Sequence, residues 1–87
     1  MFRVEYTKNA VKELSKLDKP TLRVIKHWIN KNLVDTDDPR KSGKQLKGKL
    51  SGVWRYRVGD YRLFARIEDE KLIIFIFEIG HRSEIYK

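Results

Sequence analysis

The stretch GVWRYRVGDYRLFARI, residues 52–67, has the pattern of a β-hairpin. Apolar and charged side chains alternate before and after Gly59-Asp60, as they do in strands that bury one face. Glycine at the first central position suits the two-residue type II′ turn that joins such strands. A loop this short also fixes which residues lie opposite each other. The stretch therefore predicts both the hairpin and its register.

The predicted register gathers arginine side chains on one face of the hairpin. Arg57 lies opposite Arg62, and Arg55 lies opposite Phe64. Successive side chains of a strand point to opposite faces. One face is therefore apolar and is expected to meet the rest of the core through Trp54, Tyr56, Val58, Tyr61, Leu63, Ala65 and Ile67. The other face carries Arg55, Arg57, Arg62 and Arg66, with Phe64 between them.

One strand and two helices are expected before the hairpin. Residues 2–6 alternate as a short first strand. Thr7 can cap the start of a helix that runs to about Leu17. Pro20 can begin a second helix, whose apolar stripe is formed by Leu22, Ile25, Ile29 and Leu33. A link this short between two amphipathic helices predicts an antiparallel αα-hairpin.

The remaining segments complete the predicted fold. Residues 35–49 are polar and are expected to form a loop that runs into a short strand near residues 45–50. Further strands are expected at residues 53–58, 61–68 and 72–79. The order β-α-α-β-β-β predicts an α+β fold, in which an antiparallel sheet is covered on one face by the helical hairpin. The length suits a single domain, residues 1–87.

The composition excludes several classes of protein and favours an anionic partner. Cysteine is absent, which excludes disulfides and thiolate metal sites. The N-terminal residues lack the apolar region of a signal peptide, and no apolar run approaches the roughly 20 residues of a membrane span. We therefore expect a cytoplasmic protein without a membrane partner. The net charge of +8 points to nucleic acid or to an acidic protein as the partner.

The opposed arginines indicate a binding site for anions. Like charges directly opposite each other destabilise a sheet, and such local conflicts tend to mark functional sites. The planar fork of arginine matches two phosphate oxygens, and arginine keeps its proton. Phe64 could stack a nucleotide base. The alternatives are a solvated face, an ion-pair network with Glu68, Glu78 or Glu84, and a Phe64 that is simply shielded.

Two other segments carry candidate functional groups. His81 lies between Gly80 and Arg82 where the last strand ends, and an unperturbed imidazole titrates near about pH 6.5. His27 is expected at the surface of the second helix. The polar loop carries cations that either hold nucleic-acid phosphates or only keep the loop solvated: Arg40, Lys41, Lys44, Lys47 and Lys49.

Residues 46–86, LKGKLSGVWRYRVGDYRLFARIEDEKLIIFIFEIGHRSEIY, resemble the RelE/ParE superfamily of bacterial type II toxins, on the RelE side. The resemblance rests on a combination of L-x-G, W-R-Y-R-x-G-x-Y-R, a D-E-K turn and a G-H-R-x-x-x-Y ending. The expected first strand and helical hairpin fit the same plan, so the likeness covers nearly the whole chain.

The resemblance implies a toxin that enters the ribosomal A site and cuts mRNA there. In that family the ribose 2′-hydroxyl attacks the adjacent phosphate and leaves a cyclic phosphate, without a metal or another cofactor. The implied partners are a cognate antitoxin that neutralises the toxin and the ribosome with its mRNA and rRNA. Operator DNA, reached through the antitoxin complex, is a further candidate partner.

The resemblance also implies roles for single residues. Arg55 and Arg57 occupy the positions of a basic pair, and Arg62 and Arg82 match arginines near the reacting phosphate. Family members with lysine in the pair can use it as a general base, which arginine cannot replace. Other branches of the family use a histidine near this place, so the resemblance implies His81 as the base, with Tyr86 as its acid or base partner. The residues expected to bind RNA are Lys44, Lys47, Lys49, Phe64 and Arg66.

Two other functions stay open at this point. A ParE-like toxin that poisons DNA gyrase would need no catalytic site, and its G-H-R ending would be structural. A basic RNA-binding domain without enzymatic activity would bind RNA with a steep dependence on salt. It would produce no codon-positioned cuts on a translating ribosome.

Overall fold

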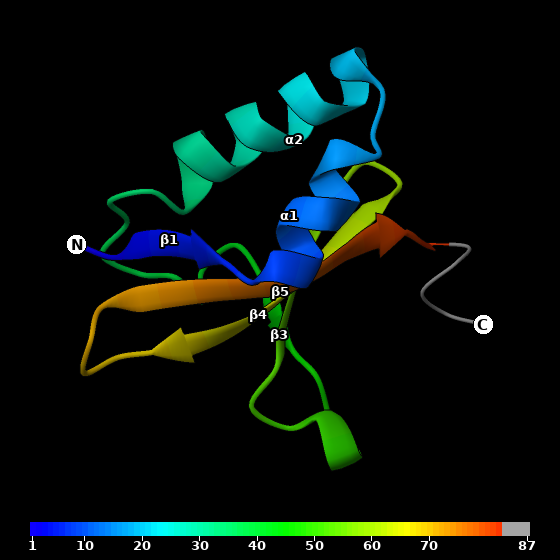
Figure 1. The fold of residues 1–87 in the computed structure, drawn as a ribbon. Helices are drawn as coiled ribbons and strands as arrows, with labels where there is room; N and C mark the ends of the chain where they lie inside the picture. The colour runs from blue at the N-terminus through cyan, green and yellow to red at the C-terminus, as the bar shows by residue number, and fades with distance from the viewer. Residues whose placement is uncertain (83–87) are drawn as a thin grey trace.

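The computed structural model describes residues 1–82. Figure 1 shows two helices that lie together on one side of a twisted sheet. The elements, in chain order, are β1 (Arg3–Tyr6), α1 (Lys8–Ser15), α2 (Lys19–Asn32), β2 (Lys44–Gln45), a 3-10 turn (Gly48–Leu50), β3 (Trp54–Val58), β4 (Tyr61–Glu68) and β5 (Ile73–His81).

The sheet has five strands in the order β1-β5-β4-β3-β2. The three pairings from β2 to β5 are antiparallel, as predicted, whereas β1 runs parallel to β5. The predicted antiparallel sheet is therefore corrected to a mixed one. No tight turn joins the first strand to the last, so local sequence does not fix their relative direction. The short strand expected near residues 45–50 is also shorter, because Lys44–Gln45 is followed by the 3-10 turn.

Both helices begin at side-chain caps, of which Thr7 was predicted and Asp18 was not. The Thr7 hydroxyl accepts a hydrogen bond from the backbone N–H of Ala10, at 3.1 Å. The Asp18 carboxylate caps α2 by accepting from the N–H of Thr21, and Pro20 stands in the first turn. These caps satisfy N–H groups that have no partner inside the helix. Helix α1 ends at Ser15, two residues before the predicted end.

The hairpin register is the predicted one. Arg57 pairs with Arg62, and Arg55 pairs with Phe64. Gly59 has a φ of +60°, which glycine adopts without strain at the first central position of the turn. The apolar face meets the helices, and the ring centroid of Tyr56 lies 5.7 Å from that of Trp28 on α2. The core is formed by Phe2, Ala10, Leu14, Ile25, Ile29, Leu33, Tyr56, Val58, Leu63, Ala65, Ile74, Ile76 and Ile79.

Helix α1 covers a length of β5 that β1 is too short to pair. The pairing of β1 with β5 ends at Tyr6 and Ile76. Beyond it, the Glu13 carboxylate accepts a hydrogen bond from the N–H of Ile79, at 2.8 Å, and one from the side chain of Asn9, at 3.1 Å. A backbone donor that would otherwise lack a partner is thus satisfied. Within residues 1–82, neither helix combines the length and apolar character that a membrane span requires.

Candidate nucleic-acid interface

The predicted arginine face exists on the side of the sheet away from the helices. Strands β3 and β4 place Arg55, Arg57, Arg62 and Arg66 on this side, because each lies between residues of the apolar face. Arg57 and Arg66 are exposed, and Arg55 is half-buried. Arg62 is the exception, since only 5% of its surface is exposed. The four residues are called the arginine face below.

Arg62 is a buried cation whose hydrogen-bond partners within residues 1–82 are backbone oxygens. Its Nη1 donates to the carbonyl oxygens of Gly59, at 3.1 Å, and Tyr61, at 3.0 Å. Its Nε has no hydrogen-bond partner among the described residues. Within residues 1–82 no carboxylate forms an ion pair with it. A buried charge is costly without a partner of opposite sign, so this position favours an anionic ligand.

Phe64 and Arg66 have different access to a ligand. Phe64 is only 7% exposed, so the expected stacking of a base on its ring is corrected to a shielded core position. The guanidinium carbon of Arg66 lies 5.8 Å from the ring centroid of Phe77, a cation–π arrangement that orients an exposed side chain. Arg66 therefore stays a candidate contact for RNA, whereas Phe64 does not.

The lysines of the polar loop fall into two places. Lys44 on β2 lies directly opposite Arg55 on β3. It borders a hollow of about 250 Å³ lined by Lys41, Ser42, Gly43, Lys44, Arg55 and Arg57. Lys47 and Lys49 are exposed on the segment that carries the 3-10 turn and extends away from the helices (Figure 1). The structure thus brings Lys44, but neither Lys47 nor Lys49, to the border of this hollow.

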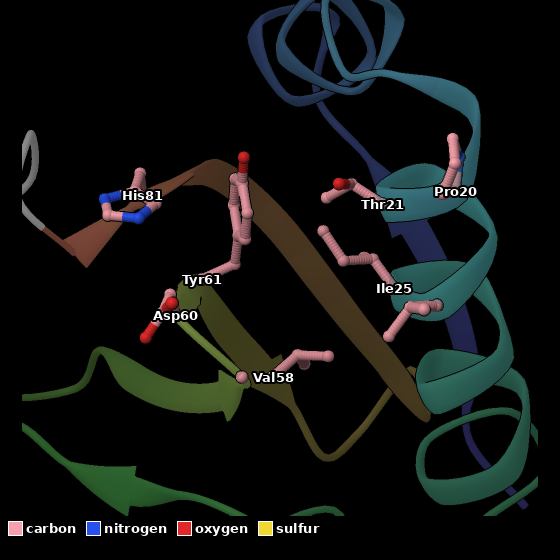
Figure 2. A pocket seen from close by; sticks show the side chains of 9 residues that line it. Pro20, Thr21, Ile25, Val58, Asp60, Tyr61 and His81 are labelled. Carbon is pink, nitrogen blue, oxygen red and sulfur yellow. The ribbon is translucent and has the colours of Figure 1, made fainter.

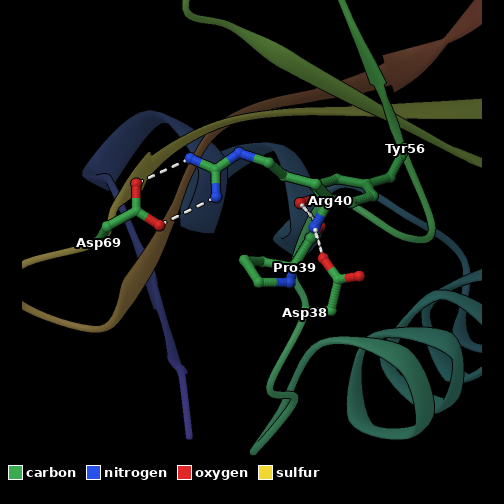
Figure 3. A network of polar contacts seen from close by, with 5 residues as sticks. All are labelled: Asp38, Pro39, Arg40, Tyr56 and Asp69. Atoms are coloured by element: carbon green, nitrogen blue, oxygen red, sulfur yellow. Dashed lines mark hydrogen bonds and ion pairs between the residues drawn. The ribbon is translucent and has the colours of Figure 1, made fainter.

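Arg40 differs from the other cations of the loop because a carboxylate already holds it. Its two terminal nitrogens donate to the two carboxylate oxygens of Asp69, at 2.9 and 2.8 Å, as Figure 3 shows. These hydrogen bonds lower the pKa of Asp69 and raise that of Arg40. The guanidinium also lies 5.6 Å from the ring centroid of Trp54. The expectation that Arg40 holds RNA phosphates is therefore corrected.

His81 lies on the helix-facing side of the sheet, opposite the arginine face. It pairs with Tyr61, and the two rings meet edge to face with centroids 5.4 Å apart. Figure 2 shows both side chains beside a cavity of about 470 Å³ that is bordered by the first half of α2 and the end of the hairpin. His27, by contrast, is exposed on α2 as predicted.

A β-bulge in β5 explains the side on which His81 lies. Arg66 pairs with Phe75 and Ala65 with Ile76, but Phe64 pairs with Glu78, so Phe77 is an extra residue. One extra residue reverses the faces of everything that follows it in the strand. His81 and the four residues of the arginine face therefore lie on opposite sides of the sheet.

The C-terminal candidates are only partly described. The backbone N–H of Arg82 donates to the carbonyl oxygen of Asp60 at 2.8 Å, which holds Arg82 beside the turn that precedes Arg62. The Arg82 side chain is exposed. Tyr86 lies outside the described residues. Within residues 1–82, no group of three or more His, Asp or Glu side chains is placed to hold a metal ion.

Comparison with known proteins gives this arrangement a family. The family model described as the ParE toxin of type II toxin–antitoxin systems, parDE, matches residues 4–86. Toxin RelG of Mycobacterium tuberculosis is 33% identical over 86 residues, which cover 99% of this chain and 97% of that protein. The chain belongs to the RelE/ParE toxin family.

Further similarities support the RelE/ParE toxin fold. The mRNA interferase toxin RelE of Escherichia coli is 29% identical over 87 residues, which cover 95% of this chain and 87% of that protein. The toxin–antitoxin complex RelBE2 of Mycobacterium tuberculosis contains a chain that matches with a TM-score of 0.84 and 32% identity. The match covers 94% of this chain and 92% of that one. The predicted α+β toxin fold is confirmed.

In this RelE/ParE toxin, sequence reasoning missed residues that depend on contacts distant along the chain. Ser42 borders the hollow, and Asp69 holds Arg40 from 29 positions away. No local pattern connects Asp69 with Arg40. A change from two-residue to three-residue apolar spacing, between Ile76 and Ile79, was the one signal of the bulge in β5. The residues on both sides of the bulge are also apolar, so the change in spacing is difficult to recognise in the sequence.

Proposed function

We propose that this toxin is a metal-independent endoribonuclease that cuts mRNA in the ribosomal A site. The observation that carries the proposal is the nearly buried Arg62, which lies on one sheet face with Arg55 and Arg57 and has no carboxylate partner among the described residues. A cation so placed suits the charge of a reacting phosphate. The name of the RelE relatives as mRNA interferases supports the same activity.

The proposed reaction is an internal phosphoryl transfer. The ribose 2′-oxygen bonds to the adjacent phosphorus while the bond from phosphorus to the 5′-oxygen breaks, which leaves a 2′,3′-cyclic phosphate. A base takes the proton of the 2′-hydroxyl, and the departing 5′-oxygen gains a proton. Arg62 and Arg82 would stabilise the charge that develops on the phosphoryl oxygens, and Arg55 and Arg57 would hold the RNA backbone. Removal of one such donor typically lowers the rate by about 100-fold or more.

Proton transfer is assigned to His81, with Tyr86 as its partner. Because His81 lies on the helix-facing side, it would have to act on RNA that passes around the end of the β3–β4 hairpin. That end is where Arg82 bonds to the turn of the hairpin through its backbone. A placed acid or base contributes about 100- to 10,000-fold to a rate. Loss of His81 should therefore lower cleavage while RNA binding to the arginine face persists.

The proposed partners are a cognate antitoxin, the ribosome with its mRNA and rRNA, and operator DNA through the antitoxin complex. The RelBE2 relative was solved as a toxin–antitoxin complex, which supports the first of these. The net charge of +8 suits an antitoxin segment rich in acidic residues as well as nucleic acid.

Mapping of mRNA 5′ ends after brief induction tests the proposed function. The natural chain should give cuts in register with codons, and Arg62→Ala should reduce them about 100-fold or more. Arg23→Ala on the exposed face of α2 removes the same charge away from the site and should cut normally. Because Arg62 also binds two backbone carbonyls, thermal unfolding must show that Arg62→Ala is folded. Full translation arrest by a folded Arg62→Ala protein would overturn the assignment.

The same experiment distinguishes the alternatives. The family model carries the ParE description, which keeps a gyrase poison as the second candidate. Such a toxin would induce the DNA damage response before translation falls, whereas an mRNA interferase stops translation first. A basic RNA-binding domain without activity would bind RNA in a salt-dependent way and leave no codon-positioned 5′ ends.

A further inference from the structure

The hollow at the β2 edge collects positive charge. Lys41, Lys44, Arg55 and Arg57 border it together with Ser42, and its lining within residues 1–82 includes no carboxylate. Lys44 lies directly opposite Arg55, and Arg57 directly opposite Arg62. The Arg57–Arg62 pair places like charges directly opposite each other in the sheet, an arrangement that a nearby anion would stabilise.

The segment that forms the outer wall of this hollow is fixed to the sheet at three points. The Arg40–Asp69 pair joins it to the turn after β4, and the Tyr56 hydroxyl donates to the carbonyl oxygen of Pro39 at 2.7 Å (Figure 3). Gly43 then approaches β3 so closely that an added Cβ would lie 2.7 Å from the Tyr56 ring. Arg40 and Gly43 are the immediate chain neighbours of the residues that line the outer wall, which are Lys41, Ser42 and Lys44.

This fixation combines polar and aromatic contacts at one loop. A two-pronged contact between arginine and a carboxylate is among the stronger polar contacts available to a protein. Arg40 also lies over the ring of Trp54, which restricts the guanidinium further. A plain solvated loop would need none of this, whereas a phosphate site needs its donors held in place before the ligand arrives.

We propose that the hollow lined by Lys41, Ser42, Lys44, Arg55 and Arg57 binds a backbone phosphate of RNA adjacent to the one that is cut, and that Asp69 acts through Arg40 as its positioning residue. The assignment of this phosphate to a cleaved RNA rests on the proposed function. Arg57 borders the hollow and faces Arg62, so one RNA strand can occupy both places. The hydroxyl of Ser42 adds a neutral donor to four cations.

A comparison of Asp69→Asn with Glu70→Gln tests the positioning role. Both substitutions remove one negative charge from the same exposed turn, but only Asp69 binds Arg40. Overall electrostatics predicts tighter RNA binding for both variants. The proposal predicts that Asp69→Asn binds inorganic phosphate and a 2′-deoxy-substituted, uncleavable oligonucleotide several-fold more weakly. Glu70→Gln should bind them at least as tightly as the natural chain, and Asp69→Glu should restore most of the loss.

Lys44→Gln provides a second test that does not endanger folding. Lys44 is an exposed residue of a two-residue edge strand, and Lys19→Gln on α2 removes the same charge elsewhere. The affinity for inorganic phosphate, measured from the shifts of backbone amide signals at residues 41–44, should fall about tenfold for Lys44→Gln. It should change little for Lys19→Gln. Equal losses for the two lysines, or unweakened binding by folded Asp69→Asn, would overturn the proposal.

These measurements separate this inference from the proposed function. Phosphate binding is measured without a ribosome and without cleavage. If phosphate binds in the hollow as described but induction yields no codon-positioned cuts, only the proposed function fails. If cuts occur but all five variants bind phosphate equally, only the hollow is wrongly assigned.

Discussion

Arg57 and Arg62 lie directly opposite each other on β3 and β4, on the side of the sheet that the helices leave uncovered. One is exposed, and the other is 5% exposed with two carbonyl oxygens as its partners. Opposed like charges lower the stability of a sheet. An anion between them would remove that penalty, so the pair connects the stability of the hairpin to its ligand.

Replacement of Arg57 should therefore separate stability from function. In Arg57→Gln the repulsion with Arg62 is absent, and the free energy of unfolding in urea should rise by roughly 0.2–1 kcal/mol. The affinity for an uncleavable RNA should fall in the same protein. Arg23→Gln removes an exposed charge of α2 and should change neither quantity appreciably. A less stable Arg57→Gln protein would show that the arginines support each other through contacts other than direct repulsion.

Gly43→Ala should destabilise the fold by steric overlap. The new Cβ would lie 2.7 Å from Cε1 of Tyr56 and 3.0 Å from the backbone oxygen of Arg55. Tyr56 is fully buried, so its ring has little freedom to move away. A loss of about 1–3 kcal/mol is expected for such overpacking, measured by urea denaturation. Lys41→Ala in the same exposed loop is the matched control, and a similar loss there would point to a general effect of the loop.

Tyr56 should make stability depend on alkaline pH. Burial raises the pKa of Tyr56 to about 12, above the unfolded value of about 10. The folded chain holds the Tyr56 proton more tightly than the unfolded chain does. The stabilising contribution of Tyr56 is therefore fully present below about pH 10. It is lost as the pH rises toward 12, with a slope of up to ~1.4 kcal/mol per pH unit.

Tyr56→Phe isolates this contribution. The variant loses the hydrogen bond to Pro39 and should be about 1 kcal/mol less stable at neutral pH. The difference between the two proteins should shrink above about pH 10. Burial also raises the pKa of Tyr6, but Tyr6 is present in both proteins and its contribution cancels. A constant difference up to pH 12 would contradict the assigned pKa.

Glu13 should be required for the attachment of α1 to β5. Glu13→Ala leaves the N–H of Ile79 without its side-chain acceptor, which should lower stability by about 1–3 kcal/mol. Glu13→Gln keeps an oxygen acceptor and should lose much less. Amide hydrogen exchange at Ile79 is the local measurement, and unchanged protection in Glu13→Ala would show that another group satisfies this donor.

Features that depend on residues close together in the chain follow from local sequence patterns. The Gly59-Asp60 turn set the register of β3 and β4, and with it the common side of the four arginines. Thr7 and Asp18 set the starts of the helices through contacts three residues away. In each case the interacting groups are so close along the chain that few backbone conformations can bring them together.

Features that join distant segments depend instead on the packing of the complete fold. It placed β1 parallel to β5, paired Arg40 with Asp69, shielded Phe64 and buried Arg62. The bulge at Phe77 then turned His81 away from the arginine face, because one extra residue reverses the alternation of side chains. Such contacts depend on how all segments of the chain pack around the same core. Short sequence patterns carry no information about that packing, because they describe only neighbouring residues.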